Sequence, residues 1–258
     1  MSTRDLSGST AVVTGASRGF GRATAIALAE RGARVIGVAR GETALHELRA
    51  RLGDNFHPVI ADVTDPLLPG RLIARYRPRT LVLNAGAAPP VGSLLEQTWD
   101  GFSTNWNVDV RHVFNFTRAA LQAPLEPGSV VVSLSSGAAL RGSPLSGGYA
   151  GAKATITIIS SYAALEARRT GSAIRFVAVL PALTPATGLG RVYTQAYAAQ
   201  AGVSETQLVE GFGGLLATEQ AAAGIRDLVV EDTYTAAAYL LTAQGLRPLD
   251  PEPAQARS

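Results

Sequence analysis

The chain has 258 residues, of which 47% are hydrophobic and 17% are charged. This composition excludes intrinsic disorder for most of its length, because disordered chains combine low hydrophobicity with high charge. The absence of cysteine excludes disulfides, cysteine-ligated metal centres and a thiol nucleophile, and three histidines leave little for a metal site. The net charge is +3, and no basic run is long enough to indicate a nucleic-acid partner.

No apolar run approaches the roughly 18 residues of a membrane span, and the opening segment MSTRDLSGSTAVVTG lacks the apolar core of a signal peptide. We therefore expect a cytoplasmic protein without a membrane partner. The length suits a single large α/β domain. We place this domain at residues 1–246, followed by a flexible tail at 247–258 that contains three prolines.

Short β-branched runs alternate with longer helical patterns along the chain. This alternation predicts a Rossmann-like α/β fold, a doubly wound parallel sheet of six or seven strands with helices on both faces. The expected strands are Ala11–Thr14, Val35–Ala39, His57–Ala61, Thr80–Leu83, Val130–Ser133 and Ile174–Val179. The expected helices are Gly21–Arg31, Glu42–Leu52, Pro66–Arg75, Thr98–Leu121 and Tyr149–Thr170. The stretch 183–226 breaks the alternation and predicts an insertion of one or two helices, a candidate substrate lid.

A glycine-rich loop, TGASRGFG, lies between the first strand and the first helix. Its three glycines allow a tight turn and a close approach of phosphate to the backbone, and the helix start offers N–H groups to a pyrophosphate. An ordinary glycine turn is the alternative. We predict a dinucleotide-binding loop formed by Gly15, Ser17, Arg18, Gly19, Phe20 and Gly21.

The end of the second strand predicts which dinucleotide binds. NAD-binding sheets carry an acid at this place, which holds the ribose 2′-hydroxyl. Here the residue is Arg40, and Arg18 adds a second guanidinium from the loop. Because guanidinium groups match phosphate geometry, we predict NADP(H) over NAD(H). The alternative is that Arg40 is a surface residue paired with Glu42.

Two further strand ends contribute candidate cofactor residues. Asp62 and Val63 follow the third strand, where Asp62 could bond an adenine amino group or simply cap the next turn. Asn84, Ala85 and Gly86 follow the fourth strand and provide small residues where a cofactor passes close to the backbone.

Tyr149 and Lys153 lie four residues apart at the start of a long helix, and therefore on one face of it. A cation beside a phenol stabilises phenolate, which suits the tyrosine to proton transfer with a carbonyl oxygen. Ser136 ends the fifth strand and could bond that oxygen. Asn107 could hold a water, although it could equally face solvent.

Taken together, TGASRGFG, ADV, LNAG, NVD, VVSLSSGAALRGSP and YAGAK resemble the short-chain dehydrogenase/reductase family over roughly residues 8–182. The resemblance implies a catalytic tetrad of Asn107, Ser136, Tyr149 and Lys153, with Tyr149 as acid/base and Asn107 fixing a relay water. The family's 13-residue serine–tyrosine gap selects Ser136 over Ser135. Its NADP(H) users carry basic residues at the positions of Arg18 and Arg40.

The chain departs from the family pattern after the sixth strand and at its end. Pro181 is followed by Thr184 and Thr187, which compete for the role of contacting the nicotinamide amide. The usual Gly-Gly pair near the end is missing, so that a seventh strand stays an open question. The pocket is expected under the insertion, with a mostly apolar lining and no basic cluster. Its substrate-binding candidates are Leu140, Leu145, Leu183, Tyr193, Tyr197 and Phe212, each of which could instead pack the insertion onto the sheet.

The leading hypothesis is an NADPH-dependent reductase that converts a hydrophobic ketone to an alcohol, reversibly. The alternatives are an NAD(H)-dependent alcohol dehydrogenase and a non-catalytic dinucleotide sensor, and the Ser136, Tyr149 and Lys153 set argues against the sensor. The family resemblance also implies a homodimer or homotetramer that pairs through the helices 98–121 and 149–170.

Overall fold

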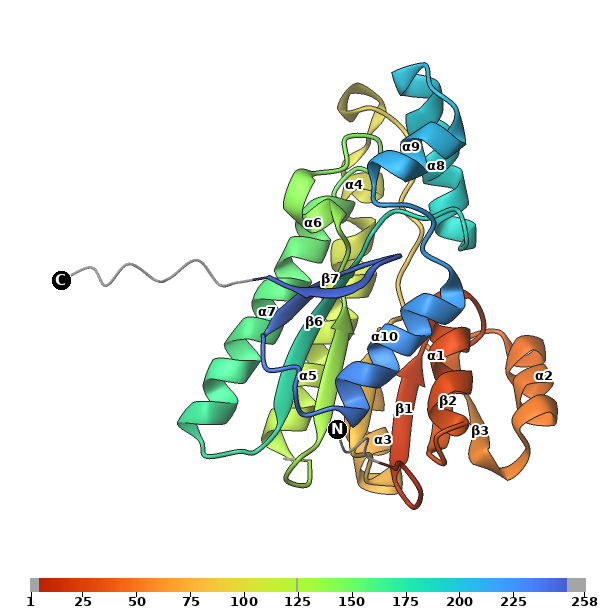
Figure 1. Ribbon diagram of the computed structural model, residues 1–258. Coiled ribbons are helices and arrows are strands. Elements are labelled where there is room, and N and C mark those ends of the chain that lie inside the picture. The colour runs from red at the N-terminus through yellow and green to blue at the C-terminus, as the bar shows by residue number, and fades with distance from the viewer. Residues whose placement is uncertain (1–4, 124, 250–258) are drawn as a thin grey trace.

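A computed structural model describes residues 5–123 and 125–249 (Figure 1). One eight-stranded sheet has the order β3-β2-β1-β4-β5-β6-β7-β8. The strands are β1 (Thr10–Thr14), β2 (Arg34–Ala39), β3 (Phe56–Ile60), β4 (Thr80–Leu83), β5 (Val130–Leu134), β6 (Arg175–Pro181), β7 (Ala238–Thr242) and β8 (Gly245–Pro248). Strands β1 to β7 pair in parallel, so their carboxyl ends share one edge, and the strand order reverses between β1 and β4. Ligands of doubly wound sheets bind at such a reversal.

Helices cover both faces of the sheet. They are α1 (Gly19–Ala29), α2 (Glu42–Leu52), α3 (Leu68–Tyr76), α4 (Trp99–Asn105), α5 (Arg111–Gln122), α6 (Ala138–Arg141), α7 (Tyr149–Arg169), α8 (Gly188–Ala201), α9 (Glu205–Gly211) and α10 (Thr218–Val230). One apolar cluster contains residues of α1, α2 and α10, and a second contains residues of α3, α5 and α7. Continuous apolar strands such as β1 are buried between these two layers. The predicted doubly wound α/β fold is confirmed.

The C-terminal region differs from the expectation in two ways. The sheet has eight strands, because a seventh parallel strand forms and β8 folds back antiparallel beside it. The expected tail boundary at residue 247 falls inside β8, and residues 250–258 lie outside the described part.

The predicted insertion, residues 183–226, contains α8, α9 and most of α10. Helix α10 packs against α1 in one of the helical layers that cover the sheet.

The predicted helix 98–121 is interrupted. A π-helical turn, Trp106–Val110, separates α4 from α5. Single π turns inside α-helices widen the backbone and are frequent at functional sites. This turn therefore decides which polar side chain of the segment faces the sheet.

Figure 1 shows α8 and α9 standing beyond the carboxyl edge of the sheet, apart from the layers that flank it. Among the helices of residues 5–123 and 125–249, none is both long enough and apolar enough to cross a membrane.

Candidate active site

A cavity of about 1330 Å³ lies over the carboxyl ends of the strands and extends under α8 and α9. It brings together most of the residues that the sequence singles out. They are Gly15, Ser17, Arg18, Gly19, Phe20, Arg40, Asp62, Val63, Asn84, Ala85, Gly86, Leu140, Ser136, Tyr149, Lys153, Pro181, Leu183, Thr184, Thr187, Tyr193, Tyr197 and Phe212. Three predicted site residues do not line it: Gly21, Asn107 and Leu145.

The glycine loop forms one end of the cavity. Gly15 and Gly19 have positive φ values of 67° and 54°, a backbone conformation that favours glycine. A Cβ on Gly15 would also lie 2.6 Å from the Asn84 side chain. Helix α1 begins at Gly19 without an acidic residue in its first turn, so its positive dipole end is free of a competing carboxylate. The loop can therefore hold a diphosphate against backbone N–H groups.

Gly21 packs closely against the glycine loop, and its predicted cofactor contact stays a prediction. A Cβ at this position would lie 2.3 Å from the carbonyl oxygen of Gly15 and 2.4 Å from Asn84 Nδ2. The first turn of α1 therefore rests directly on the loop, and Gly21 points inward, away from the cavity. Spacing alone could not separate this glycine from the two that line the cavity.

Asn84 connects the loop to the end of β4. Its side-chain amide donates to the carbonyl of Thr14 at 3.0 Å. The backbone N–H groups of Asn84 and Ala85 donate to the Thr14 hydroxyl at 2.9 and 3.1 Å. Asn84 thus holds the carboxyl ends of β1 and β4 in place at the point where the strand order reverses.

Two exposed guanidinium groups stand after the first and second strands, Arg18 in the loop that follows β1 and Arg40 directly after β2. Arg18 and Arg40 are both exposed and line the cavity. Glu42, the ion partner considered for Arg40, instead bonds His46 at 3.2 Å. Asp62 accepts hydrogen bonds from the backbone and hydroxyl of Thr64, at 2.8 and 2.7 Å. Those bonds, with the nearby Arg40, lower the pKa of Asp62. The carboxylate therefore caps its turn through Thr64, and Asp62 also lines the cavity.

The two serines at the end of β5 have different partners. The Ser135 hydroxyl is buried, donates to the Lys153 carbonyl at 2.7 Å and accepts from Thr157 at 3.0 Å. The Ser136 hydroxyl accepts from the backbone N–H of Ala138 at 3.2 Å. Because a hydroxyl carries one proton, that contact leaves the Ser136 proton available to an oxygen in the cavity.

Tyr149 begins α7, and Lys153 follows one turn later. The Lys153 ammonium lies 5.5 Å from the centre of the Tyr149 ring. It donates to the Leu134 carbonyl at 3.0 Å and forms an ion pair with Asp109, also at 3.0 Å. Burial by itself would lower the pKa of Lys153, but the Asp109 carboxylate and the Tyr149 phenol outweigh it and raise this pKa above its ordinary value. Lys153 is therefore a buried ammonium beside a phenol.

Comparison with known proteins agrees with this geometry. Residues 9–198 match the sequence model of the short chain dehydrogenase family, which covers most of the chain. The chain belongs to the short-chain dehydrogenase family. It is 34% identical over 189 residues to an uncharacterized short-chain type dehydrogenase/reductase of Sinorhizobium fredii, covering 72% of this chain and 71% of that protein.

Two reductases are also similar. The 3-oxoacyl-[acyl-carrier-protein] reductase of Escherichia coli is 32% identical, over 66% of this chain and 72% of its own. L-xylulose reductase of Mus musculus is 30% identical, over 62% and 66% respectively. The protein is thus an oxidoreductase of the short-chain dehydrogenase family, whose members use nicotinamide dinucleotides.

The structure places Asn107 outside the cavity lining, and its role in fixing a relay water stays a prediction. Asn107 is exposed, and its amide donates to the Ser103 hydroxyl at 3.2 Å. The buried residue beside Lys153 is Asp109, two positions later. Successive residues of a helix turn by about 100°, so that two positions move a side chain to the opposite face. A search for any polar residue on the same helix face as the buried positions could have found Asp109.

Two threonines follow β6 in this short-chain dehydrogenase. Thr184 is buried and its hydroxyl donates to the Leu216 carbonyl at 2.8 Å. Thr187 caps α8 by accepting from the Gly190 N–H at 3.0 Å, which leaves its hydroxyl proton unused. Its methyl group lies 3.6 Å from the position of a Cβ on Gly19. Thr187 is therefore the threonine that closes over the glycine loop.

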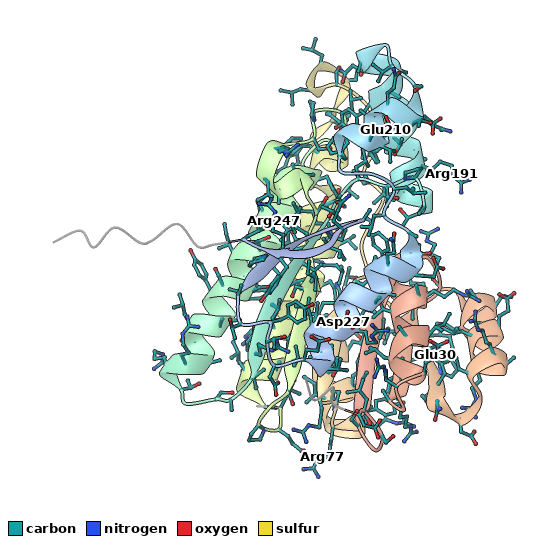
Figure 2. All side chains as sticks on the ribbon, in the orientation of Figure 1. Glu30, Arg77, Arg191, Glu210, Asp227 and Arg247 are labelled. Carbon is teal, nitrogen blue, oxygen red and sulfur yellow. The ribbon has the colours of Figure 1, made fainter. Side chains whose placement is uncertain are left out.

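The substrate end of the cavity is formed by α8, α9 and the segments around them. Leu145, which was predicted to line the cavity, is not among its lining residues, and its backbone N–H donates to the Tyr197 hydroxyl at 3.1 Å. Two arginines that were not predicted as site residues, Arg141 and Arg247, also line the cavity. Figure 2 shows Arg247 on the β7–β8 hairpin. The lining is mixed at this end, not purely apolar.

Proposed function

We propose that this short-chain dehydrogenase is an NADPH-dependent reductase that converts a ketone to an alcohol, reversibly. The observation that carries the proposal is that Ser136, Tyr149 and Lys153 line the same cavity as the glycine loop. A dinucleotide that enters at the loop and a carbonyl group at Tyr149 would therefore share one cavity, as hydride transfer requires.

The residues divide the chemistry among them. When bound, the nicotinamide supplies the hydride to the carbonyl carbon or accepts it in reverse. Tyr149 gives its phenol proton to the carbonyl oxygen as the general acid. Ser136, whose hydroxyl proton is free of local partners, donates a hydrogen bond to the same oxygen and stabilises its developing charge. The Lys153 ammonium stabilises the negative charge that Tyr149 carries after it has given its proton to the carbonyl oxygen.

The preference for NADPH rests on Arg18 and Arg40. Both guanidinium groups are exposed at the end of the cavity that the glycine loop forms, and Glu42, the partner considered for Arg40, forms a hydrogen bond with His46 instead. A 2′-phosphate is a dianion that such groups bind well, whereas NADH has only a hydroxyl at that position.

The substrate is proposed to be a ketone with an apolar body. Leu140, Leu183 and Phe212 contribute apolar surface to the substrate end of the cavity. The similar proteins of Escherichia coli and Mus musculus are both reductases, which supports the reductive direction over the NAD(H)-dependent oxidation considered as an alternative. A dinucleotide sensor has no need of a proton donor at Tyr149.

A screen of ketones with NADPH and NADH, followed by loss of reduced-nicotinamide absorbance, tests the proposal. We expect turnover with apolar ketones and a higher kcat/KM for NADPH than for NADH. Tyr149→Phe should lower kcat by about 100-fold or more, because the ring then has no proton to give. NADPH binding, measured by fluorescence, should change little.

Tyr76→Phe is the matched control, since Tyr76 lies on α3 outside the cavity lining. Turnover that survives intact in Tyr149→Phe would contradict the assignment of the acid. A clear preference for NADH would contradict the assignment of Arg18 and Arg40.

A further inference from the structure

A buried ion pair stands behind the Tyr149 phenol. The Asp109 carboxylate lies 3.0 Å from the Lys153 ammonium, and both side chains are almost fully removed from solvent. Asp109 lies on the π-helical turn and Lys153 on α7, and both line the cavity. A buried charge pair is costly to assemble and more costly to break, because removal of one partner leaves the other charge without compensation.

Asp109 is held by contacts from two other segments. One carboxylate oxygen accepts from the Ala87 backbone N–H at 2.8 Å and from the Asn105 amide at 3.3 Å. The other oxygen faces Lys153. Gly86 makes room for the carboxylate, since a Cβ there would lie 2.6 Å from it. The loop after β4, the π turn and α7 therefore meet at this one side chain.

The hydrogen bonds of the Lys153 ammonium indicate what the ion pair does. A lysine ammonium has three N–H donors. One is directed to the Leu134 carbonyl and one to Asp109. A single donor is left for the cavity, where Tyr149 stands. The carboxylate thus fixes both the charge and the direction of Lys153.

Lys153 is also unusual in the composition of the chain. Lys153 is the only lysine among 258 residues, and the other 22 basic residues are arginines. A guanidinium is planar and larger than an ammonium, and its five donors do not fit a site with two acceptors and one open direction. The sole lysine stands where a compact, directed charge is needed.

We propose that Asp109 is a positioning residue that holds the Lys153 ammonium charged and directed at Tyr149 through a direct, buried ion pair. This inference rests on the proposed function for its catalytic meaning, although the pair itself can be tested without cofactor or ketone. The titratable groups around Lys153 are Asp109 on the π turn, Tyr149 on its own helix and His112 on α5.

The experiment uses the sole lysine as its own probe. Full-length protein labelled with ¹³C-lysine gives one lysine side-chain signal, which is titrated by NMR in wild type and in Asp109→Asn. We expect the wild-type ammonium to stay charged past the ordinary lysine pKa of 10.5. In Asp109→Asn the signal should titrate at a clearly lower pH, because an amide carries no charge to oppose desolvation.

Kinetics then connect the pair to turnover. In Asp109→Asn, kcat for ketone reduction should be lower than in wild type by about 10-fold or more, while KM changes little. As pH is raised, the decline of kcat should begin at a lower pH in the variant than in wild type. Asp100→Asn is the control, because Asp100 is an exposed carboxylate on the neighbouring α4. It should reproduce the wild-type titration and pH profile.

Superimposable lysine titrations of wild type and Asp109→Asn would overturn the proposal, whatever the enzyme reduces. If Asp109→Asn does not fold, the wild-type titration decides, since a lysine that loses its proton below pH 10.5 is not held by a carboxylate. The proposed function is contradicted by different results, namely that ketones are not reduced or that Tyr149→Phe stays active.

Discussion

His112 illustrates how position alone sets the charge of a side chain. It is fully buried on α5, and its ring meets the edge of Phe116 with 5.0 Å between ring centres. Burial lowers the pKa of His112 from 6.5 to about 4, although the Asp109 carboxylate acts in the opposite direction. The imidazole is therefore neutral near pH 7 in the folded protein, whereas an unfolded chain would take up a proton near pH 6.5.

This difference predicts how stability depends on pH. The folded pKa is lower than the unfolded pKa, so the unfolded state binds more protons between these values and stability is lost as pH falls from about 6.5 towards 4. The free energy of unfolding, measured with urea, should be lower at pH 4.5 than at pH 7 in wild type. In His112→Gln this decrease should be smaller by about 2 kcal/mol.

The control is His46→Gln, because His46 is exposed on α2 and bonds only Glu42 in the described structure. Its pH dependence should match that of wild type. Equal losses of stability in wild type and His112→Gln would show that His112 does not carry the effect.

At the scale of elements, α8 is tied across the cavity by two tyrosines. The Tyr193 hydroxyl donates to the Pro89 carbonyl at 2.7 Å, and burial raises the pKa of this tyrosine. The Tyr197 hydroxyl bonds Ser143 at 2.7 Å and accepts from the Leu145 N–H at 3.1 Å. The helix thus closes the cavity by contacts to the loops after β4 and α6, and its role as a moving lid stays a prediction.

Removal of one tie tests this element. Tyr197→Phe loses the bonds to Ser143 and Leu145, at a cost of about 1 kcal/mol. We expect a several-fold higher KM for the ketone, a smaller change in kcat, and faster amide hydrogen exchange in α8. Unaltered exchange in α8 would show that the tyrosine does not hold the helix down.

At the scale of the whole molecule, an apolar surface follows the outer sides of α5 and α7. Phe114, Ile158, Tyr162 and Leu165 are all exposed large side chains there. The two helices pack side by side. Exposed apolar patches of this kind mark interaction surfaces, and they support the homodimer or homotetramer that the family resemblance implies.

A charge on this surface should separate the subunits. The double replacement Tyr162→Asp with Leu165→Asp should shift the protein to a smaller species by gel filtration with light scattering, because buried unpaired carboxylates oppose association. The control is Leu67→Asp, an equally exposed leucine just before α3. A monomeric wild type, or a double variant of wild-type size, would contradict the assignment of this surface.

The sequence by itself determined the architecture, and most of the site residues predicted from it line the cavity. Strand and helix periodicities are local, so the alternation from Thr10 to Pro181 could be interpreted without contacts. The glycine loop, Ser136, Tyr149 and Lys153 stand at strand ends or helix starts, and the parallel topology brings all such points to one edge. The order of these elements along the chain was enough to predict that they meet.

The tertiary structure alone decided which side chains face inward. Asn107 and Asp109 are polar neighbours in sequence, yet the π turn points one to solvent and the other to Lys153. Likewise, Gly21 packs on the loop, and β8 exists only because β7 offers it an edge. Rotation about a helix and pairing at a sheet edge depend on neighbours distant in the chain, and no local pattern encodes them.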